Sequence, residues 1–392
     1  MFKFISRPSN KFMSPQKVQK LQRHSTRAMF FVGGFGAASW APLVPILRER
    51  LAIGEDVLGM LLLCIGIGSL LTMPISGAAA SRFGCKRVLI PAGILFAIML
   101  LVLCNISNFA LAIPSLLIFG AVMGCIDVVV NIQAVIVEKA AGRQLMSGMH
   151  ALWSVGGFVG AGLFGVWVGI IGLTPLMSTI IAALIIMAIV FKYGTYLLPH
   201  GGEKSGKIFA IPRGIVTFVG IIAFIAFLVE GAIMDWSGVF LTTVRNFDIS
   251  LAGVGFTMFS AAMLIMRLVG DRLSQAAGQK LVVLSGSTLA FIGFLSIIFA
   301  DSAILIYLGF FMIGIGSANI VPIFFSMLGR QKVMPISTAV PAVTTLGYLG
   351  ILAGPAAIGF LAHQTSLYTA FGFLAGLIVL QFLISNYVFK NS

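Results

Sequence analysis

The sequence predicts an all-α polytopic membrane protein, with twelve transmembrane helices in two pseudo-symmetric six-helix bundles. Three observations support this class. The 392-residue chain is 59% hydrophobic and only 9% charged, with a mean hydropathy of +1.09, whereas a soluble domain is about 25% charged. Twelve apolar runs are each long enough to cross a bilayer as a helix. Polar and aromatic positions of the first half recur in the second half, about 194 residues later.

The apolar runs fall into two sets of six. The first set lies near residues 28–47, 58–80, 88–104, 110–136, 148–171 and 174–197, and the second near 214–241, 250–268, 280–299, 303–327, 337–362 and 367–389. We therefore expect a basic cytosolic tail (1–27), a first bundle (28–197), a cytosolic linker (198–213) and a second bundle (214–392).

The basic residues predict the orientation. An even number of spans puts both termini on one side, and 22 of the 25 Lys and Arg residues then fall on that side. Only Arg48, Arg50 and Arg245 fall on the other side. Because cytoplasmic segments are enriched in Lys and Arg, both termini are expected in the cytoplasm.

The net charge of +14 does not indicate nucleic-acid binding, because it is concentrated in these inner segments. Residues 1–27 carry seven Lys or Arg and no acid, which fits a transit peptide or, as we favour, a cytosolic tail. No cleavable secretory signal is predicted. The four cysteines form no Cys-x-x-Cys pair, so neither a metal site nor a disulfide is expected.

One acidic side chain lies deep in the fourth apolar run. Asp127 precedes the polar Glu138 by 11 residues, which places it about 16 Å from the helix end and near the bilayer centre. A carboxylate there costs about 2.5–3.5 kcal/mol and usually marks an ion or solute path. Asp127 is the candidate proton-binding group, and a structural contact between helices is the alternative. Asn131 shares its helix face and could bind that acid or a solute hydroxyl. Gln133 is expected to make a packing or interhelical contact.

The two halves repeat several of these positions. Ser39-Trp40 matches Asp235-Trp236, and Gly124-Cys125-Ile126-Asp127 matches Gly316-Ser317-Ala318-Asn319. The spacings are 196 and 192 residues, so one parallel repeat accounts for both. Parallel repeats describe a secondary transporter with its solute site near the bilayer midplane.

The segment between the second and third runs carries a loop motif. Gly77, Ser81, Arg82, Gly84 and Arg87 resemble the Gly-x-x-x-Asp-Arg-x-Gly-Arg-Lys/Arg motif of the major facilitator superfamily, with Ser81 in place of the acid. In the matching loop of the second half, which begins at Arg267, Asp271 and Arg272 keep the acid. The resemblance implies that these residues act in conformational change.

Further motifs resemble the fucose-permease-like branch of that superfamily, and in particular its uncharacterised bacterial inner-membrane members. They are Asp127-x-x-x-Asn131, His150-Ala151-Leu152-Trp153-Ser154-Val155-Gly156-Gly157, Glu230 to Ser237 and Gly347 to Pro355. The resemblance covers residues 28–389 and implies a multi-pass protein of the bacterial inner membrane. The fucose symporter uses an acid in its first span, and this chain has none between Arg27 and Arg48. This departure argues against fucose as the substrate.

The seventh run contains two more acids. Glu230 and Asp235 are five residues apart, so they point about 140° away from one another and only one can face a narrow cavity squarely. We favour Glu230 as a second proton-coupling residue, with structural ion pairing as the alternative. Asp235 remains a candidate for solute contact. Trp236 could stack on a sugar ring or pack between helices.

Other polar and aromatic residues complete the candidate solute site. The resemblance places Asn319 and Tyr348 on helices that line the central cavity of the family. His150 could join a proton path or make a helix-end hydrogen bond. Trp40 lies beside Pro42 and Pro45, where the first span is expected to bend.

These features predict a secondary transporter, not an enzyme. No nucleotide-binding loop, catalytic triad spacing or metal cluster occurs in the sequence, so no cofactor is expected. We expect a monomer in the lipid bilayer that moves a small neutral or cationic solute, such as a sugar, by proton-coupled symport. Proton-coupled export by antiport is the alternative, and a membrane sensor with this fold is a third possibility. A multiply charged anion is not expected, because no basic residue is predicted deep in a span.

Overall fold

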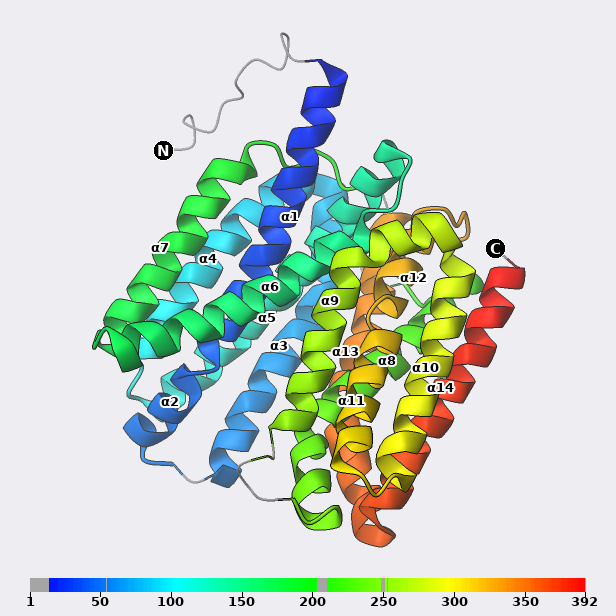
Figure 1. Ribbon diagram of the computed structural model, residues 1–392. Coiled ribbons are helices and arrows are strands. Elements are labelled where there is room, and N and C mark those ends of the chain that lie inside the picture. The colour runs from blue at the N-terminus through cyan, green and yellow to red at the C-terminus, as the bar shows by residue number, and fades with distance from the viewer. Residues whose placement is uncertain (1–13, 54, 203–209, 248–250, 252, 392) are drawn as a thin grey trace. The chain divides into compact units, whose positions relative to one another are not determined.

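The computed structural model describes residues 14–53, 55–202, 210–247, 251 and 253–391, and these form an α-helical protein (Figure 1). The first 13 residues of the predicted tail and the middle of the predicted linker, residues 203–209, lie outside the described residues. The first-half helices are α1 (Pro15–Trp40), α2 (Leu43–Leu51), α3 (Glu55–Phe83), α4 (Cys85–Asn105), α5 (Phe109–Ala141), α6 (Met146–Gly165) and α7 (Pro175–Gly194). The second-half helices are α8 (Ile215–Val239), α9 (Val254–Ala277), α10 (Gln279–Phe299), α11 (Ala303–Ser317), α12 (Ile320–Leu328), α13 (Ile336–Gln364) and α14 (Leu367–Lys390).

Twelve helical segments in the described part of the chain are long and apolar enough to cross a membrane, which confirms the twelve predicted spans. Short polar residues fix where several helices begin. Ser14, Asn108, Thr174 and Ser366 each accept a hydrogen bond from the backbone N–H three residues later, at the starts of α1, α5, α7 and α14. Each cap satisfies a donor that the first helical turn leaves unpaired.

The first helix differs from the prediction. It begins at Pro15, thirteen residues before the expected start of the span. Pro at the first helical position and the Ser14 cap start the helix there, before its sequence becomes apolar. The early turns carry exposed Lys17 and Lys20 and extend an otherwise apolar helix.

Two spans are interrupted within their length. The first breaks between Trp40 and Leu43, as the prolines predict, and continues as α2. The tenth breaks at Asn319, between α11 and α12, where the backbone leaves the helical region (φ −102°, ψ 1°). Pro322 follows three residues later and cannot donate to the carbonyl of Ala318. The repeat-related α5 runs unbroken through Asp127.

The chain forms two compact units that do not follow the chain order completely. Unit 1 comprises Met1–Gly142, Met149–Ala210 and Pro335–Pro341. Unit 2 comprises Arg143–Gly148, Ile211–Met334 and Ala342–Ser392. The start of α6 therefore belongs to the unit that holds α8 to α12, and the start of α13 belongs to the unit that holds α1 to α5.

Small residues set the helix spacing within each unit. In unit 1, a Cβ atom on Gly156 or Gly160 of α6 would lie 2.4 Å from a backbone oxygen of α1. In unit 2, a Cβ atom on Gly350 of α13 would lie 2.2 Å from the Phe224 oxygen of α8. The absence of a side chain therefore permits close helix contact at these three positions. Gly162 meets nothing within 4 Å, so it is not part of such a contact.

Candidate functional site

In unit 1, Asp127 and Asn131 form a hydrogen-bonded pair on one face of α5. The Asn131 Nδ2 donates to Asp127 Oδ1 at 3.0 Å and to the Asp127 carbonyl oxygen at 2.9 Å. Asn131 is buried, with 1% of its surface exposed, and Asp127 is half-buried. The four-residue spacing puts the two side chains one helical turn apart, as predicted.

His150 of α6 extends this pair. Its Nε2 lies 3.2 Å from the Asn131 Oδ1, and its ring packs against Phe30 of α1 with centroids 5.0 Å apart. Because Asn131 already donates through Nδ2, its oxygen accepts, which assigns the proton to His150 Nε2 in this arrangement. A polar chain thus runs from a carboxyl through an amide to an imidazole, across two helices.

Gln133 belongs to a separate structural contact. It is fully buried, donates to the Thr26 hydroxyl of α1 at 3.0 Å and accepts from the Leu198 backbone N–H at 3.1 Å. The predicted interhelical contact is confirmed. These bonds connect α5, α1 and the segment after α7.

In unit 2, Asn319 occupies the position that Asp127 holds in unit 1, and its surroundings differ. Its Nδ2 donates to the Met266 carbonyl oxygen at 3.3 Å, and its buried Oδ1 has no hydrogen-bond partner in the described structure. The position four residues later is the apolar Ile323. Asn319 therefore lacks the amide neighbour that Asp127 has.

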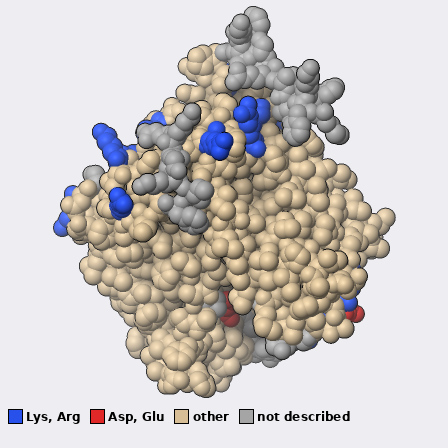
Figure 2. Space-filling view, turned by 180° about the vertical axis from the view of Figure 1, so that it is seen from behind, with Lys and Arg blue, Asp and Glu red and all other residues tan. Residues whose placement is uncertain are grey.

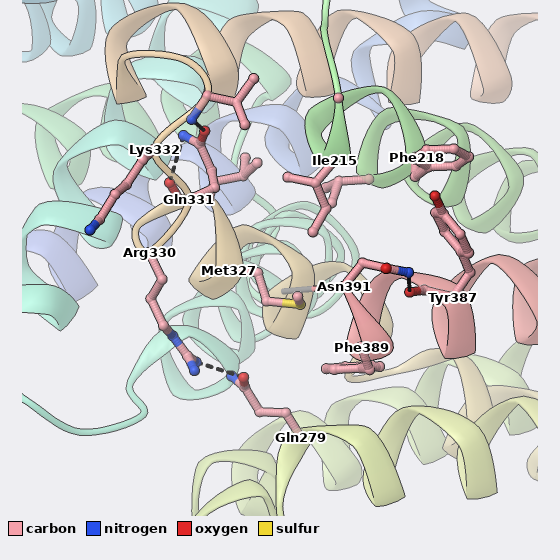
Figure 3. A pocket seen from close by; sticks show the side chains of 14 residues that line it. Ile215, Phe218, Gln279, Met327, Arg330, Gln331, Lys332, Tyr387, Phe389 and Asn391 are labelled. Carbon is pink, nitrogen blue, oxygen red and sulfur yellow. Dashed lines mark hydrogen bonds between the residues drawn. The ribbon is translucent and has the colours of Figure 1, made fainter.

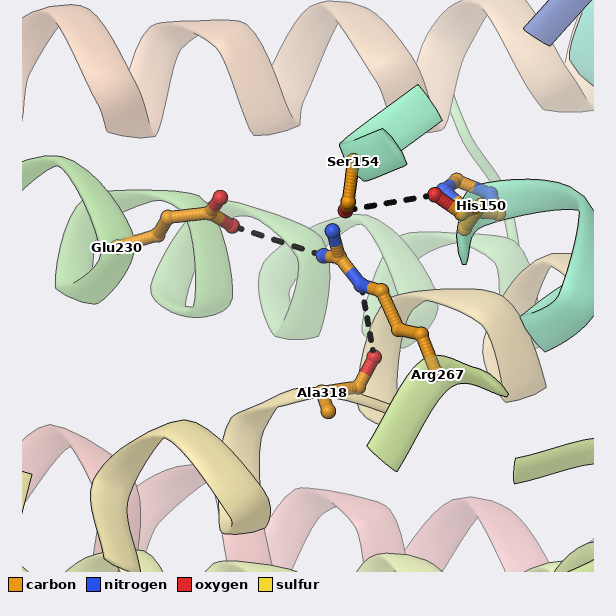
Figure 4. A network of polar contacts seen from close by, with 5 residues as sticks. All are labelled: His150, Ser154, Glu230, Arg267 and Ala318. Carbon is orange, nitrogen blue, oxygen red and sulfur yellow. Dashed lines mark hydrogen bonds and ion pairs between the residues drawn. The ribbon is translucent and has the colours of Figure 1, made fainter. Parts of the chain in front are cut away.

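Glu230 of α8 forms an ion pair with Arg267 of α9. The Arg267 Nη2 lies 3.9 Å from Glu230 Oε2, and its Nε donates to the Ala318 carbonyl at 3.3 Å (Figure 4). The Ala318 oxygen is the acceptor that Pro322 leaves unpaired in the broken helix. Arg267 is 8% exposed, whereas a third of the Glu230 side chain is exposed.

This pair corrects one sequence argument. The sequence pattern groups Arg267 with the loop motif and predicts no basic residue deep in a span. The structure instead places Arg267 near the middle of α9, buried and opposite the mid-helix Glu230. The pair could have been predicted from the cost of burying a charge. An acid and a cation within spans each require a partner, and each is the other's candidate.

The remaining candidates of unit 2 lie in different surroundings. Asp235 is exposed, five residues after the half-buried Glu230. Trp236 packs against the unit 2 core and lies close to Gly359 of α13. Tyr348 of α13 is half-buried and meets Phe227 edge-on, with ring centroids 6.2 Å apart.

In unit 1, Trp40 is 7% exposed and packs against the Phe119 ring at 5.7 Å. It therefore fills the space beside the break between α1 and α2. The structure shows a packing role for this residue, and contact with a solute stays a prediction.

The loop motif of the first half forms the turn between α3 and α4. Gly84 has φ +86° and begins the turn into α4. A Cβ atom there would lie 2.0 Å from the Pro199 carbonyl oxygen. A Cβ atom on Gly77 would lie 2.3 Å from Pro341. Ser81 is buried, whereas Arg82 and Arg87 are exposed.

The matching turn of the second half uses its acid. Asp271 accepts hydrogen bonds from the backbone N–H groups of Ser147 and Gly148, each at 2.9 Å. These amides belong to the first turn of α6, where unpaired N–H groups favour a carboxylate. Arg272 is exposed. Sequence reasoning did not identify Ser147 and Gly148 as the partners of Asp271.

The polar groups gathered in the two units are carboxyl, amide, imidazole and guanidinium groups. Among the described residues, no group of three or more His, Cys, Asp or Glu is arranged to hold a metal ion. The two polar clusters are Asp127–Asn131–His150 in unit 1, which reaches from α5 to the start of α6, and Glu230–Arg267 in unit 2. Carboxyl and imidazole groups can exchange protons, and amides can bind hydroxyls or amines.

Comparison with known proteins agrees with this picture. A sequence profile described as Major Facilitator Superfamily matches residues 28–332. An uncharacterized MFS-type transporter of Yersinia pestis is 46% identical over 360 residues, which cover 91% of this chain and 93% of that protein.

Two solved structures share the fold at low identity. The human organic anion transporter MFSD10 has a TM-score of 0.76 and 19% identity, covering 95% of this chain and all of that one. A structure of the E. coli fucose:proton symporter FucP has a TM-score of 0.75 and 15% identity, covering 93% and 98% of the two chains. The predicted all-α fold class and the resemblance to the major facilitator superfamily are confirmed. The chain belongs to the major facilitator superfamily of membrane transporters.

Proposed function

We propose that this transporter couples proton movement to the symport of a small neutral or cationic polar solute, with Asp127 as the proton-binding group. The observation that carries the proposal is the hydrogen-bonded chain from Asp127 through Asn131 of α5 to His150 of α6. A carboxyl group within a span raises the free energy of the protein in lipid, so such a group usually has a functional role or a polar partner. Here it is joined to a second group that can exchange protons, the imidazole of His150.

The charges of unit 2 support the proposed substrate class. Arg267 is matched by Glu230, so this pair carries no net charge. A phosphate ester or dicarboxylate would need a cation that is available to it, because burial of an unmatched anion is costly. A neutral or cationic solute has no such requirement. Glu230 is proposed as a second proton-coupling residue, and its ion pair with Arg267 leaves this cation matched.

Two structural neighbours are described as a fucose:proton symporter and a proton:xylose symporter. Their low identity shows a shared fold, and the proposal of proton coupling rests on the residues of this chain. We place the protein in the bacterial plasma membrane with both termini in the cytoplasm, because of the charge distribution of its sequence. On the face shown in Figure 2, most of the visible Lys and Arg side chains lie near one end.

The test is uptake by purified protein in liposomes with an alkaline interior. A panel of labelled sugars, nucleosides, amines and organic phosphates identifies the solute, and counterflow without a gradient measures exchange. We expect a neutral or cationic solute to accumulate, and Asp127→Asn to reduce gradient-driven accumulation at least tenfold while exchange partly remains. Asn keeps the shape of Asp but cannot release a proton. The matched control is Asp301→Asn, the same change at an exposed acid between α10 and α11.

Three outcomes would overturn parts of the proposal. Accumulation by Asp127→Asn at the wild-type rate would remove Asp127 from coupling. Uptake of phosphate esters alone would refute the substrate class. Uptake driven only by an acidic interior would replace symport with antiport. The orientation is tested separately in a cysteine-free background, where a membrane-impermeant maleimide added to intact cells should label a cysteine at position 301 and not one at position 139.

A further inference from the structure

Unit 2 contains a cavity of about 640 Å³ at the end where α8 begins and α12 and α14 end (Figure 3). Every residue that lines it belongs to this unit. The lining consists of Gly214, Ile215, Phe218, Val219, Gln279, Met327, Leu328, Arg330, Gln331, Lys332, Val333, Tyr387, Phe389 and Asn391. These side chains form an apolar wall and a cationic rim.

The apolar wall is built from the helix ends. The Phe218 ring of α8 packs on Tyr387 of α14, with centroids 4.9 Å apart. Figure 3 shows Ile215, Met327 and Phe389 around the same space. Half of Tyr387 is exposed (51%). Aromatic rings with a polar edge are typical of the boundary between hydrocarbon and lipid headgroups.

The cationic rim is a short, well-fixed loop after α12. Gln331 donates to the carbonyl oxygens of Leu328 and Met334, and accepts from the backbone N–H groups of Val333 and Met334. This bonding holds the exposed Arg330 and Lys332 on either side of Gln331. Arg330 donates to Gln279 Oε1 at 2.6 Å. Among the residues that the structure describes, no Asp or Glu lines the cavity, so the charge of this lining is positive.

We propose that this cavity binds the headgroup and first acyl carbons of an anionic phospholipid. Arg330 and Lys332 would contact the phosphate, since guanidinium and ammonium groups are its usual protein partners. The apolar wall would contact the glycerol and acyl chain. A soluble phosphate would leave that wall uncovered, whereas a lipid fills both parts. Basic pockets between helices near the cytoplasmic surface are a known form of lipid recognition.

A related groove in unit 1 repeats this chemistry. It measures about 690 Å³ and is lined by His24, Arg27, Ala28, Phe31, Leu152, Ala188, Ile189, Lys192 and Tyr193. Tyr193 and Tyr387 stand 194 residues apart, as do His24 and Phe218. Basic side chains again accompany an aromatic ring between the first and last helices of a half, and no acid occurs in the described part of the lining. Because both halves of the chain carry this arrangement, we favour a ligand to which both are exposed. Lipids of the bilayer meet this condition.

The test measures lipid binding to the delipidated full-length protein by native mass spectrometry. The probes are phosphatidylglycerol, phosphatidylcholine with the same acyl chains, glycerol phosphate and inorganic phosphate. We expect saturable phosphatidylglycerol binding that Arg330→Gln with Lys332→Gln weakens at least tenfold for one bound lipid. Ile215→Trp, which fills the cavity without changing charge, should weaken the same lipid. Arg27→Gln with Lys192→Gln should weaken a second lipid.

The matched control is Lys17→Gln with Lys139→Gln, which removes the same charge from exposed positions outside both cavities. We expect this variant to bind both lipids as the wild type does. An equal loss in the control would mean general surface attraction and would overturn the proposal. Equal binding of phosphatidylcholine, or binding of free phosphate as tight as that of the lipid, would also overturn it. Wild-type binding by folded Ile215→Trp would exclude this cavity.

Discussion

The turn between α3 and α4 and the turn between α9 and α10 occupy the same place in the repeat and are held in different ways. In the first turn, backbone packing dominates: Gly84 lies against Pro199, and the backbone N–H groups of Cys85 and Lys86 donate to the carbonyls of His200 and Leu198. Beside the second turn, side-chain hydrogen bonds make the stabilising contacts. Asp271 accepts two backbone N–H groups of the segment 143–148.

The helix before the second turn, α9, also extends one helical turn further past the motif than α3 does. Ser81 and Asp271 are 190 residues apart, but Gly84 and Gly278 are 194 apart and have the same backbone conformation (φ +86° and +85°). The four added residues include Gln275, which donates to the Gln144 carbonyl at 3.1 Å. The comparison teaches that one position in a repeat can be stabilised by close packing in one copy and by charge and amide contacts in the other.

Replacing Gly84 and Gly278 with alanine should give the largest difference in stability between the two turns. Both alanine variants face a positive φ that costs about 1–3 kcal/mol. In Gly84→Ala the new Cβ also lies 2.0 Å from a backbone oxygen, whereas in Gly278→Ala it meets nothing within 4 Å. We expect Gly84→Ala to lose at least about 3 kcal/mol and Gly278→Ala about 1 kcal/mol. Thermal unfolding in detergent measures this, and the yield of monodisperse protein ranks variants that do not fold. Equal losses would contradict the packing argument for the first turn.

Asp271→Asn should have the next largest effect. It removes a charge and one of the two oxygens that accept from Ser147 and Gly148. Hydrogen bonds to a charged group contribute about 1.5–3 kcal/mol, so we expect a loss of about 1–2 kcal/mol in the free energy of unfolding. Ser81→Ala, the neutral counterpart, should lose less. A greater loss in Ser81→Ala would show that the two turns do not differ in this way.

Gln279→Leu tests the amide contacts of the second turn. Gln279 donates to Gln144 Oε1 at 2.7 Å and accepts from Arg330. We expect a loss of about 1 kcal/mol in the free energy of unfolding, because this buried side chain loses two hydrogen bonds, one of them with a charged group. Combined with Asp271→Asn, the losses should not add, since both residues hold the segment 143–148. Strict additivity in the double-mutant cycle would mean that the two contacts are independent.

Lys86→Met should have the smallest effect. Lys86 Nζ donates to the Thr195 carbonyl at 3.0 Å, beside the first turn. Since backbone packing already holds this turn, we expect a loss of about 0.5 kcal/mol, within the range of surface substitutions. Melting temperatures at low and high salt provide the measurement. A loss larger than that of Asp271→Asn would reverse the comparison.

The spans were predictable because each helix in lipid must be long and apolar, and this constraint is visible in any window of the sequence. The break at Trp40 was predictable for a similar local reason, the prolines that follow it. The pairing of Asp127 with Asn131 also followed from helical spacing alone.

Contacts between distant segments could not be predicted in the same way. Arg267 and Glu230 are 37 residues apart, and no spacing rule joins them. The partners of Asp271 lie more than 120 residues earlier, in a helix that otherwise belongs to the other unit. Hydropathy identifies which residues are buried, but only the packing of helices determines which buried groups meet.

The division of the chain into units has a consequence for biosynthesis. Unit 2 includes residues 143–148, which leave the ribosome early, and unit 1 includes residues 335–341, which leave it late. Domains often fold as they emerge, in order from the N-terminus. Unit 1 cannot complete in that order, because one of its segments is made only after about 330 residues. A chain cut in the linker would leave each fragment without a segment that its unit requires, and the two fragments would have to assemble together.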